Sequence, residues 1–319
     1  GVIDESVRGM DLYILVDVCN YSLTYSMSGN TNHMSPDDHY QNLKRIIAAV
    51  GGKAKRINVI MPFLYESRQH KRSSRESLDC ALALQELTHM GVDNIITFDA
   101  HDPRVQNAIP LSGFETVRPT YQFVKGLLDR YDDLIIDSDH MMAISPDEGA
   151  TERAVYLANV LNLDMGMFYK RRDYTRVVNG RNPIVAHEFL GSSVEGKDVI
   201  ILDDMISSGD SILDVAKQLK SRNAKRIFAA ATFGLFTNGL DKFDEAYESG
   251  LIDGVLTTNL IYQTPELLSR PYYINCDMSK YVALMIDTLN HDGSISDILD
   301  PSERIQVCVE EYKKAHGQL

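Results

Sequence analysis

The 319 residues of this chain are too many for one ordinary hydrophobic core and indicate two domains. Apolar residues make up 44% and charged residues 24% of the chain, which is typical of a globular protein. The formal net charge of -13 argues against a nucleic-acid partner, because a polyphosphate backbone requires a broad basic face. A small phosphorylated ligand, which needs only a local cluster of donors, is not excluded.

Cysteine usage and hydropathy predict where the protein works. Cys19, Cys80, Cys276 and Cys308 form no close pair in the sequence, so neither a zinc knuckle nor a redox pair is indicated. We expect reduced thiols and a cytoplasmic location. No apolar run approaches the roughly 20 residues that cross a bilayer, and the first residues do not resemble a signal peptide. No membrane partner is therefore expected.

Strand-like apolar runs alternate with helix-like patterns along the chain. Predicted strands cover 56–63, 94–99, 141–145, 199–204, 226–233 and 254–259, and predicted helices cover 76–90 or begin at Thr151 and Ser211. Alternation of this kind predicts an α/β fold of mostly parallel sheets flanked by helices. Because the strands are short and continuously apolar, we expect them to be buried on both faces.

A domain boundary is predicted close to Pro119. It gives an N-terminal domain over 1–120, a second domain over 121–290 and a C-terminal tail over 291–319. Residues 21–38 are polar and predict a long surface loop.

The strongest chemical signal is VIILDDMISSGDSILDVAKQL, residues 199–219. A buried strand ends in Asp203 and Asp204, and a loop of small residues follows. Ser211 then opens a helix, with Asp214 as its expected capping partner. Small residues let backbone N–H groups approach an anion, and paired acids can bind two adjacent hydroxyl groups. The pattern suits a ribose phosphate; an ordinary strand–turn–helix with surface acids is the alternative.

This stretch resembles the PRPP-binding loop of type I phosphoribosyltransferases and of ribose-phosphate diphosphokinases, the PRPP synthetases. Four further segments resemble signatures of the synthetase in order and rough spacing: LYESRQHKRSSRES, TFDAHDPRVQ, ISPDEGATERA and YKRRD. The first is similar to the family's Tyr-x-Arg-Gln-Asp segment, and the second to its Asp-Leu-His-Ala segment. A phosphoribosyltransferase would share only the loop at 203–211, so the chain is identified as a divergent member of the PRPP synthetase family.

The resemblance implies an ATP site in the first domain and a metal. Arg68 and Gln69 would contact ATP, although a basic segment of this kind can also be a solvated face. His101, just after the strand that ends in Asp99, would act in catalysis and contact the ATP phosphates and their magnesium. Asp99 and Asp147 would be metal ligands with it, Asp147 near the ribose, because carboxylates suit Mg²⁺.

The resemblance also implies the sugar site and the transfer machinery. Lys170 and Arg172 alternate along an extended segment and would stabilise the transferring diphosphoryl group, with a solvated cluster as the alternative. Residues 173–195 would form the catalytic loop that closes over the reaction. The ribose 5-phosphate site would consist of Asp203, Asp204, Ser207, Ser208, Gly209, Asp210 and Ser211.

Four departures from the family pattern stand out. The family's N-terminal strand and Phe-x-Asp-Gly-Glu segment are not found, so the sequence is incomplete there or the ATP site is built differently. In the sugar loop the family's third acid is Ser207, its glycine is Asp210 and its threonine is Ser211. Asp210 places a negative charge beside the expected phosphate, which is unfavourable unless its side chain turns away. The region after Gln106 is short, and residues 21–38 and the C-terminal tail are long.

Together these features predict two phosphoribosyltransferase-type domains with the site between them. The expected reaction is transfer of the diphosphoryl group of ATP to ribose 5-phosphate with Mg²⁺, giving PRPP and AMP, by a homohexamer built from dimers. A non-catalytic, PRPP-synthetase-like regulatory subunit is the alternative, and a phosphoribosyltransferase that consumes PRPP is a third hypothesis.

Overall fold

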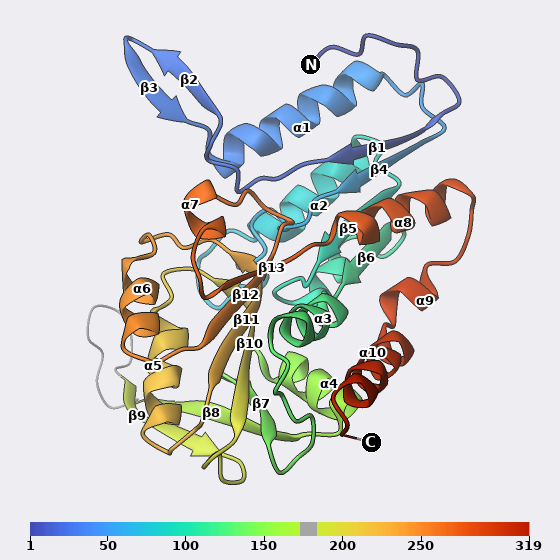
Figure 1. The fold of residues 1–319 in the computed structure, drawn as a ribbon. Helices are drawn as coiled ribbons and strands as arrows, with labels where there is room; N and C mark the ends of the chain where they lie inside the picture. The colour runs from blue at the N-terminus through green and yellow to red at the C-terminus, as the bar shows by residue number, and fades with distance from the viewer. Residues whose placement is uncertain (173–183, 319) are drawn as a thin grey trace. The chain divides into compact units, whose positions relative to one another are not determined.

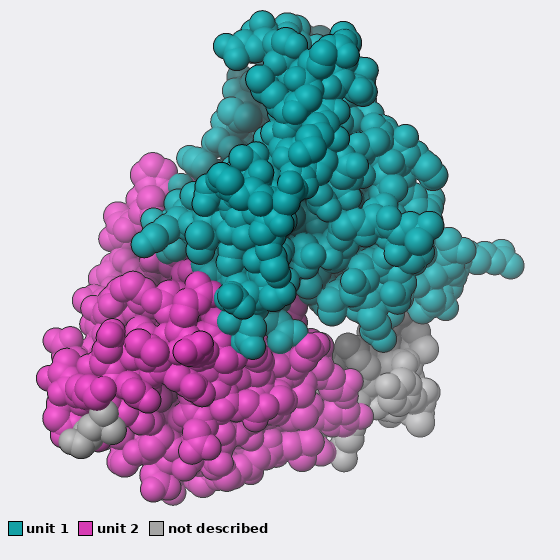
Figure 2. Space-filling view, turned by 90° about the vertical axis from the view of Figure 1, so that its right-hand side faces the viewer, with its two compact units in different colours: residues 1–119, 259–263, 277–300 teal, residues 120–258, 264–276, 301–319 magenta. Residues whose placement is uncertain are grey.

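The computed structural model describes residues 1–172 and 184–318, and for 170–172 and 184–187 it describes the backbone alone. The chain forms two compact units (Figure 2). Unit 1 comprises residues 1–119, 259–263 and 277–300, and unit 2 comprises residues 120–258, 264–276 and 301–319. Among the described helices, none combines the length and apolar character needed to cross a bilayer.

Unit 1 is a four-stranded parallel sheet with helices (Figure 1). The strand order is β1-β4-β5-β6, and all three pairings are parallel. Helix α1 begins with a capping box between Ser35 and Asp38 and ends at Gly51 in the left-handed conformation. The elements of the unit are β1 (Asp11–Leu15), β2 (Thr24–Met27), β3 (Asn30–His33), α1 (Pro36–Val50), β4 (Arg56–Ile60), α2 (Asp79–His89), β5 (Asn94–Phe98), the 3-10 helix Pro103–Ala108, β6 (Gly113–Val117), α8 (Ser279–Asn290) and α9 (Ser296–Leu299).

The predicted surface loop at 21–38 contains regular structure. Strands β2 and β3 pair as an antiparallel hairpin, and α1 begins at Pro36. The residues of both strands are largely exposed, so the segment lies at the surface as expected. No strand is predicted here from the sequence because the hairpin has no buried face, and an alternation of apolar and polar residues is the pattern by which a strand is recognised.

Unit 2 is a seven-stranded sheet in the order β13-β12-β11-β10-β7-β8-β9. Every described pairing in it is parallel except β8 with β9. Its elements are α3 (Thr120–Arg130), β7 (Met141–Ser145), α4 (Thr151–Leu161), β8 (Asp164–Arg172), β9 (Ile184–Leu190), β10 (Asp198–Ile206), α5 (Asp210–Lys220), β11 (Ile227–Gly234), α6 (Asp241–Glu248), β12 (Gly254–Thr258), α7 (Pro265–Leu268), β13 (Tyr273–Cys276) and α10 (Ser302–Ala315). The predicted α/β fold of parallel sheets flanked by helices is confirmed.

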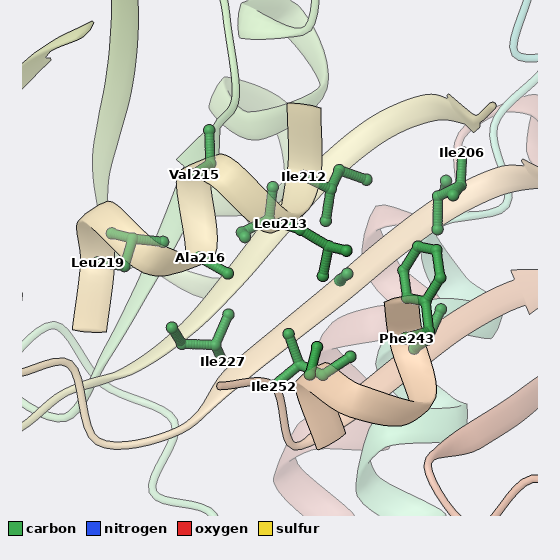
Figure 3. Packing of buried hydrophobic residues seen from close by; sticks show 14 of the residues in the cluster. Ile206, Ile212, Leu213, Val215, Ala216, Leu219, Ile227, Phe243 and Ile252 are labelled. Carbon is green, nitrogen blue, oxygen red and sulfur yellow. The ribbon is translucent and has the colours of Figure 1, made fainter. Parts of the chain in front are cut away.

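Strand β10 is buried on both faces of this sheet. Val199 and Ile201 belong to a core cluster that also contains apolar residues of α5 and α6 (Figure 3). Ile200 and Leu202 belong to a second cluster with residues of α3, α4 and α10. Alternate side chains of one strand thus enter two cores, which is why its sequence is continuously apolar rather than alternating.

The units differ from the predicted domain bounds in the last third of the chain. Residues 259–263 and 277–300 group with unit 1, whereas 301–319 group with unit 2. In unit 1 the backbone N–H of Tyr262 donates to Asp17 Oδ2 at 2.7 Å. In unit 2 Tyr312 Oη of α10 donates to the carbonyl of Tyr131 at 2.8 Å. These contacts join residues far apart in the sequence, so no local pattern could have assigned the segments.

A buried ion pair joins the amino ends of β10 and β11. Arg226 donates two hydrogen bonds to Asp198, from Nε to Oδ1 at 2.9 Å and from Nη2 to Oδ2 at 2.7 Å. Arg226 Nη1 also donates to Asp133 Oδ1 at 2.7 Å. The side chain of Asp198 is 4% exposed, so the pair is shielded from solvent, and this planar geometry favours arginine over lysine.

Removing one partner of this pair is expected to destabilise unit 2. Asp198→Ala should lower the free energy of unfolding by about 3 kcal/mol, near the lower end for a broken buried pair, because Asp133 still accepts from Arg226. Urea denaturation measures this loss. The control Asp129→Ala breaks an exposed pair with Lys125 and should cost less than about 1 kcal/mol. Equal losses in the two variants would contradict a special role for the Asp198–Arg226 pair.

Candidate active site

The loop between β10 and α5 is shaped to receive an anion. Gly209 has a φ of 83° and precedes Asp210, the first residue of α5. A Cβ at Gly209 would lie 2.4 Å from Cε2 of Phe243, so this position excludes any side chain for two independent reasons. The backbone N–H groups at the start of α5 and the helix dipole favour a negatively charged ligand.

Residues that follow β11 form hydrogen bonds and apolar contacts with this loop. The N–H of Leu235 donates to the carbonyl of Ile206 at 2.9 Å, and the N–H of Thr237 donates to that of Ser207 at 3.0 Å. Phe243 of α6 packs against Gly209 and makes an edge contact with Phe236 at 5.2 Å between ring centroids. The loop is therefore supported over its length by chain that follows it by about thirty residues in sequence.

The start of α5 differs in detail from the expected cap. The sequence predicted a helix that begins at Ser211 with Asp214 as its capping partner. The helix begins instead at Asp210 after Gly209, with no side-chain cap, and Asp214 lies 3.5 Å from Lys217 Nζ. The left-handed glycine lets the helix begin directly from the loop, and the N–H of Asp210 donates to Ser208 Oγ at 3.4 Å.

Asp210 itself turns its carboxylate onto two neighbours. Ser208 Oγ donates to Oδ2 at 2.9 Å, and Lys242 Nζ of α6 donates to Oδ1 at 2.5 Å. The hydrogen bonds from Lys242 and Ser208 lower the pKa of Asp210 below its usual value. The negative charge that the sequence places at this position is thus paired with a lysine 32 residues away.

Asp203 and Asp204 follow the continuously buried residues 198–202 of β10. Asp203 Oδ1 accepts from the N–H of Asp204 at 2.8 Å, and Asp204 is 4% exposed. Burial, followed by repulsion from Asp204 and Asp147, raises the pKa of Asp203 well above its usual 3.8. The structure thus brings Asp147 close enough to influence these two acids, although it precedes them by more than fifty residues. A bound cation, or ligand hydroxyl groups that donate hydrogen bonds to these carboxylates, would relieve this concentration of negative charge.

Asp147 organises the turn that begins α4. Its Oδ1 accepts from the N–H of Gly149 at 3.0 Å, and its carbonyl accepts from Ser145 Oγ at 2.6 Å. The turn follows β7, which is the neighbour of β10 in the sheet. Asp147 and the acids of β10 therefore lie at the carboxyl edge of the same sheet, where parallel α/β folds collect their functional groups.

Unit 1 brings the other two predicted segments together. Asp99 follows β5, is buried, and adopts a φ of 42°, which is strained for a residue with a side chain. The rings of His101 and His70 are 5.2 Å apart, and His70 Nε2 lies 3.5 Å from Asp102 Oδ2. The segment with Arg68 and Gln69 thus lies beside the segment with His101, although thirty residues separate them.

His70 and Asp102 were not singled out from the sequence. His70 stands where the family pattern has an aspartate, and Asp102 stands where it has an alanine. Asp102 also accepts from Arg104 Nε at 2.9 Å, and the hydrogen bond from Arg104 lowers the pKa of Asp102 to about 2. His70 and Asp102 are therefore close in space. A comparison of each position separately with the family pattern does not reveal this contact. Gln69 donates from Nε2 to the carbonyl of Ser77 at 3.0 Å.

Lys170 and Arg172 lie on β8, the extended segment that the sequence predicted. Their side chains, and residues 173–183 of the predicted catalytic loop, lie outside the described residues. The later part of that loop contains β9, which pairs antiparallel with β8 and has a register shift between Arg171 and Arg172. A strand, rather than irregular loop, therefore occupies residues 184–190.

Metal coordination was predicted through His101, Asp99 and Asp147. Among the residues that the structure describes, no group of three or more His, Cys, Asp or Glu side chains is arranged to hold a metal ion. A site of protein ligands alone is thus not formed by them. Magnesium commonly takes one or two carboxylates and completes its shell with substrate phosphates and water, and Asp147 beside Asp203 fits that arrangement.

Comparisons with known proteins agree along the chain. Residues 1–91 match the N-terminal domain of ribose phosphate pyrophosphokinase, and residues 118–258 match the phosphoribosyl transferase domain. A ribose-phosphate pyrophosphokinase of Mycoplasma genitalium is 31% identical over 262 residues, which cover 82% of this chain and 71% of the relative. The enzyme of the same name from Vibrio parahaemolyticus is 28% identical and covers 92% of this chain and 85% of its own.

The fold agrees with a solved structure. The phosphoribosylpyrophosphate synthetase of Mycobacterium smegmatis superimposes with a TM-score of 0.73 at 24% identity, covering 91% of this chain and 86% of that one. The match to the N-terminal domain separates this chain from phosphoribosyltransferases, which would share the second domain alone. The chain belongs to the ribose-phosphate pyrophosphokinase family of enzymes, the PRPP synthetases.

Proposed function

We propose that this protein transfers the diphosphoryl group of ATP to O1 of ribose 5-phosphate, forming PRPP and AMP. The observation that carries the proposal is the carboxyl edge of β10. There, the half-buried Asp203 and the buried Asp204 precede a candidate anion-binding loop within a chain of the PRPP synthetase family. A product of this kind supplies activated ribose for nucleotide biosynthesis. We also propose a cytoplasmic location, which is supported by the four free cysteines.

The sugar would bind on unit 2. Backbone N–H groups of Ser208, Gly209 and the first turn of α5 would donate to the 5-phosphate. Asp203 and Asp204 would accept from the ribose hydroxyls, which replace the water that burial has removed from these carboxylates. Because the acids precede the loop in the chain, the hydroxyls and the 5-phosphate of ribose 5-phosphate would be bound by separate groups.

The nucleotide would bind on unit 1. Arg68 is exposed and can place its guanidinium on phosphate oxygens, and Gln69 would contact the nucleotide beside it. His101 would contact the phosphates, with His70 and Asp102 fixing the position of its segment. The strained backbone of Asp99 sets the direction of the chain into this segment.

Magnesium ions would be coordinated jointly by protein side chains and by substrate oxygens. On unit 2 Asp147 and Asp203 would hold an ion beside the ribose, and on unit 1 we keep His101 and Asp99 as ligands for an ion on the ATP phosphates. When bound, the ion supplies positive charge that neutralises phosphate oxygens. Ionised Asp203 then has an opposite charge close by, which offsets the repulsion from Asp204 and Asp147.

The transfer is a displacement at the β-phosphorus in which O1 attacks and AMP leaves. Such a reaction needs little covalent assistance, so positioning and charge neutralisation supply most of the rate. Lys170 and Arg172 would stabilise the charge that builds on the oxygens of the transferring group, arginine by two parallel hydrogen bonds. Their benefit would be greater in the transition state than in the ground state.

AMP formation tests the proposed reaction directly. The protein is expected to release AMP from ATP only when ribose 5-phosphate and Mg²⁺ are present. Lys170→Ala should lower kcat by about 10²- to 10³-fold, the effect of losing one donor to a developing oxyanion, with little change in the KM for ribose 5-phosphate. Binding of both substrates without any turnover would favour the regulatory-subunit alternative.

Asp203→Asn separates the binding role of this acid from its cost to stability. The variant should raise the KM for ribose 5-phosphate, because an amide lacks the negative charge of a carboxylate and has one acceptor oxygen instead of two. Since the native pKa of Asp203 is raised, the folded protein loses stability as pH rises above 3.8, and the variant escapes this loss.

The substrate-free variant should therefore resist urea more than wild type at about pH 7.5, and the gain should shrink towards about pH 5. A variant that is less stable at both pH values would show that Asp203 is held by favourable contacts instead.

We further propose self-association, as a homohexamer built from dimers. Family membership supports this proposal, because the expected ATP site of the family is shared between subunits. Sedimentation velocity at micromolar concentration should give a species near six times the 35.9 kDa chain mass. A monomer across that concentration range would contradict the proposal.

A further inference from the structure

The second residue of α6 lies beside the first residue of α5. Lys242 donates from Nζ to Asp210 Oδ1 at 2.5 Å, while Ser208 holds Oδ2 at 2.9 Å. Phe243, the next residue of α6, packs against Gly209 in the same loop. Of these two consecutive side chains of α6, Phe243 thus restricts the backbone at Gly209 and Lys242 pairs with the carboxylate of Asp210.

Asp210 would otherwise oppose the ligand that the loop is built for. Its carboxylate lies at the first turn of α5, where the helix dipole stabilises any anion, so it competes with a phosphate for the same favourable field. A second negative charge within a few ångströms also repels a phosphate directly. The family pattern has glycine at this position, which carries neither effect.

We propose that Lys242 is a positioning residue for ribose 5-phosphate, one that acts through Asp210. By pairing with the carboxylate, Lys242 neutralises its charge and holds it beside α6, which reduces its repulsion of a 5-phosphate at the loop. The inference rests on the proposed function, since it takes the 203–211 loop as the sugar phosphate site.

The size of the effect follows from the exposure of the pair. The side chains of Lys242 and Asp210 are 51% and 56% exposed, so solvent and salt screen the interaction strongly. A modest change in ligand affinity is therefore expected, about three- to tenfold in low salt. Lys220, in the last turn of the same helix α5, donates to the carbonyl of Lys225 at 2.9 Å and lies 4.0 Å from Asp253, so it offers a control lysine whose partners do not include Asp210.

Calorimetric binding of ribose 5-phosphate to the full-length protein tests the inference. Lys242→Ala should weaken binding about three- to tenfold, and Lys242→Arg should restore it, because arginine keeps the charge. In an Asp210→Gly background, Lys242→Ala should have no further effect. The loss should also diminish at about 1 M salt, where the screening length is about 3 Å. The control Lys220→Ala should bind like wild type.

Each contrary outcome identifies a different failure. An equal loss from Lys242→Ala with and without Asp210 would show that the lysine contacts the phosphate itself and would overturn the inference. Wild-type affinity in Lys242→Ala would overturn it as well, provided that circular dichroism shows a folded protein. Absence of ribose 5-phosphate binding by the wild type would instead overturn the proposed function, and the inference with it.

Discussion

The burial of β10 on both faces is the constraint on which the unit 2 site depends. Apolar side chains alternate from Val199 to Leu202 into two separate cores, so no polar group of the strand can be accommodated until it reaches the carboxyl edge. Asp203 and Asp204 stand at that edge, still largely buried. The pKa of Asp203 is raised because this position removes water from its carboxylate and places it near other acids. The same burial that stabilises the sheet thus prepares a pair of acceptors for a ligand.

The loop after β10 obtains its shape from a neighbour that is distant in sequence. Gly209 is required by its backbone conformation and by the ring of Phe243, which fills the space a side chain would need. The chain after β11 accounts for the hydrogen bonds of Ile206 and Ser207. The loop is therefore supported by regular elements, which would suit its proposed role in positioning a sugar for transfer.

Residues that depart from the family pattern are compensated by a second residue that contacts them. Asp210 is unfavourable considered alone, but Lys242 neutralises it; His70 replaces an expected aspartate, and Asp102 supplies a carboxylate beside it. Such pairs keep the local charge of a site while changing the residues that carry it. A divergent sequence can thus preserve the chemistry of its family without preserving each position.

The fold class, the family and the order of the chemical segments could be predicted from the sequence, because these depend on local patterns: continuous apolar strands, a glycine before a helix, and acids at a strand end. The hairpin at 24–33 was not predicted, because neither of its faces is buried. The grouping of 259–263 and 277–300 with unit 1 was not predicted either, because it depends on contacts between residues distant in the sequence. The three-dimensional structure was needed to show that Asp147 lies near Asp203, that the ring of His70 lies near that of His101, and that Lys242 pairs with Asp210. Each of these relations is a distance between residues remote in the chain, and charges interact through space rather than along the sequence.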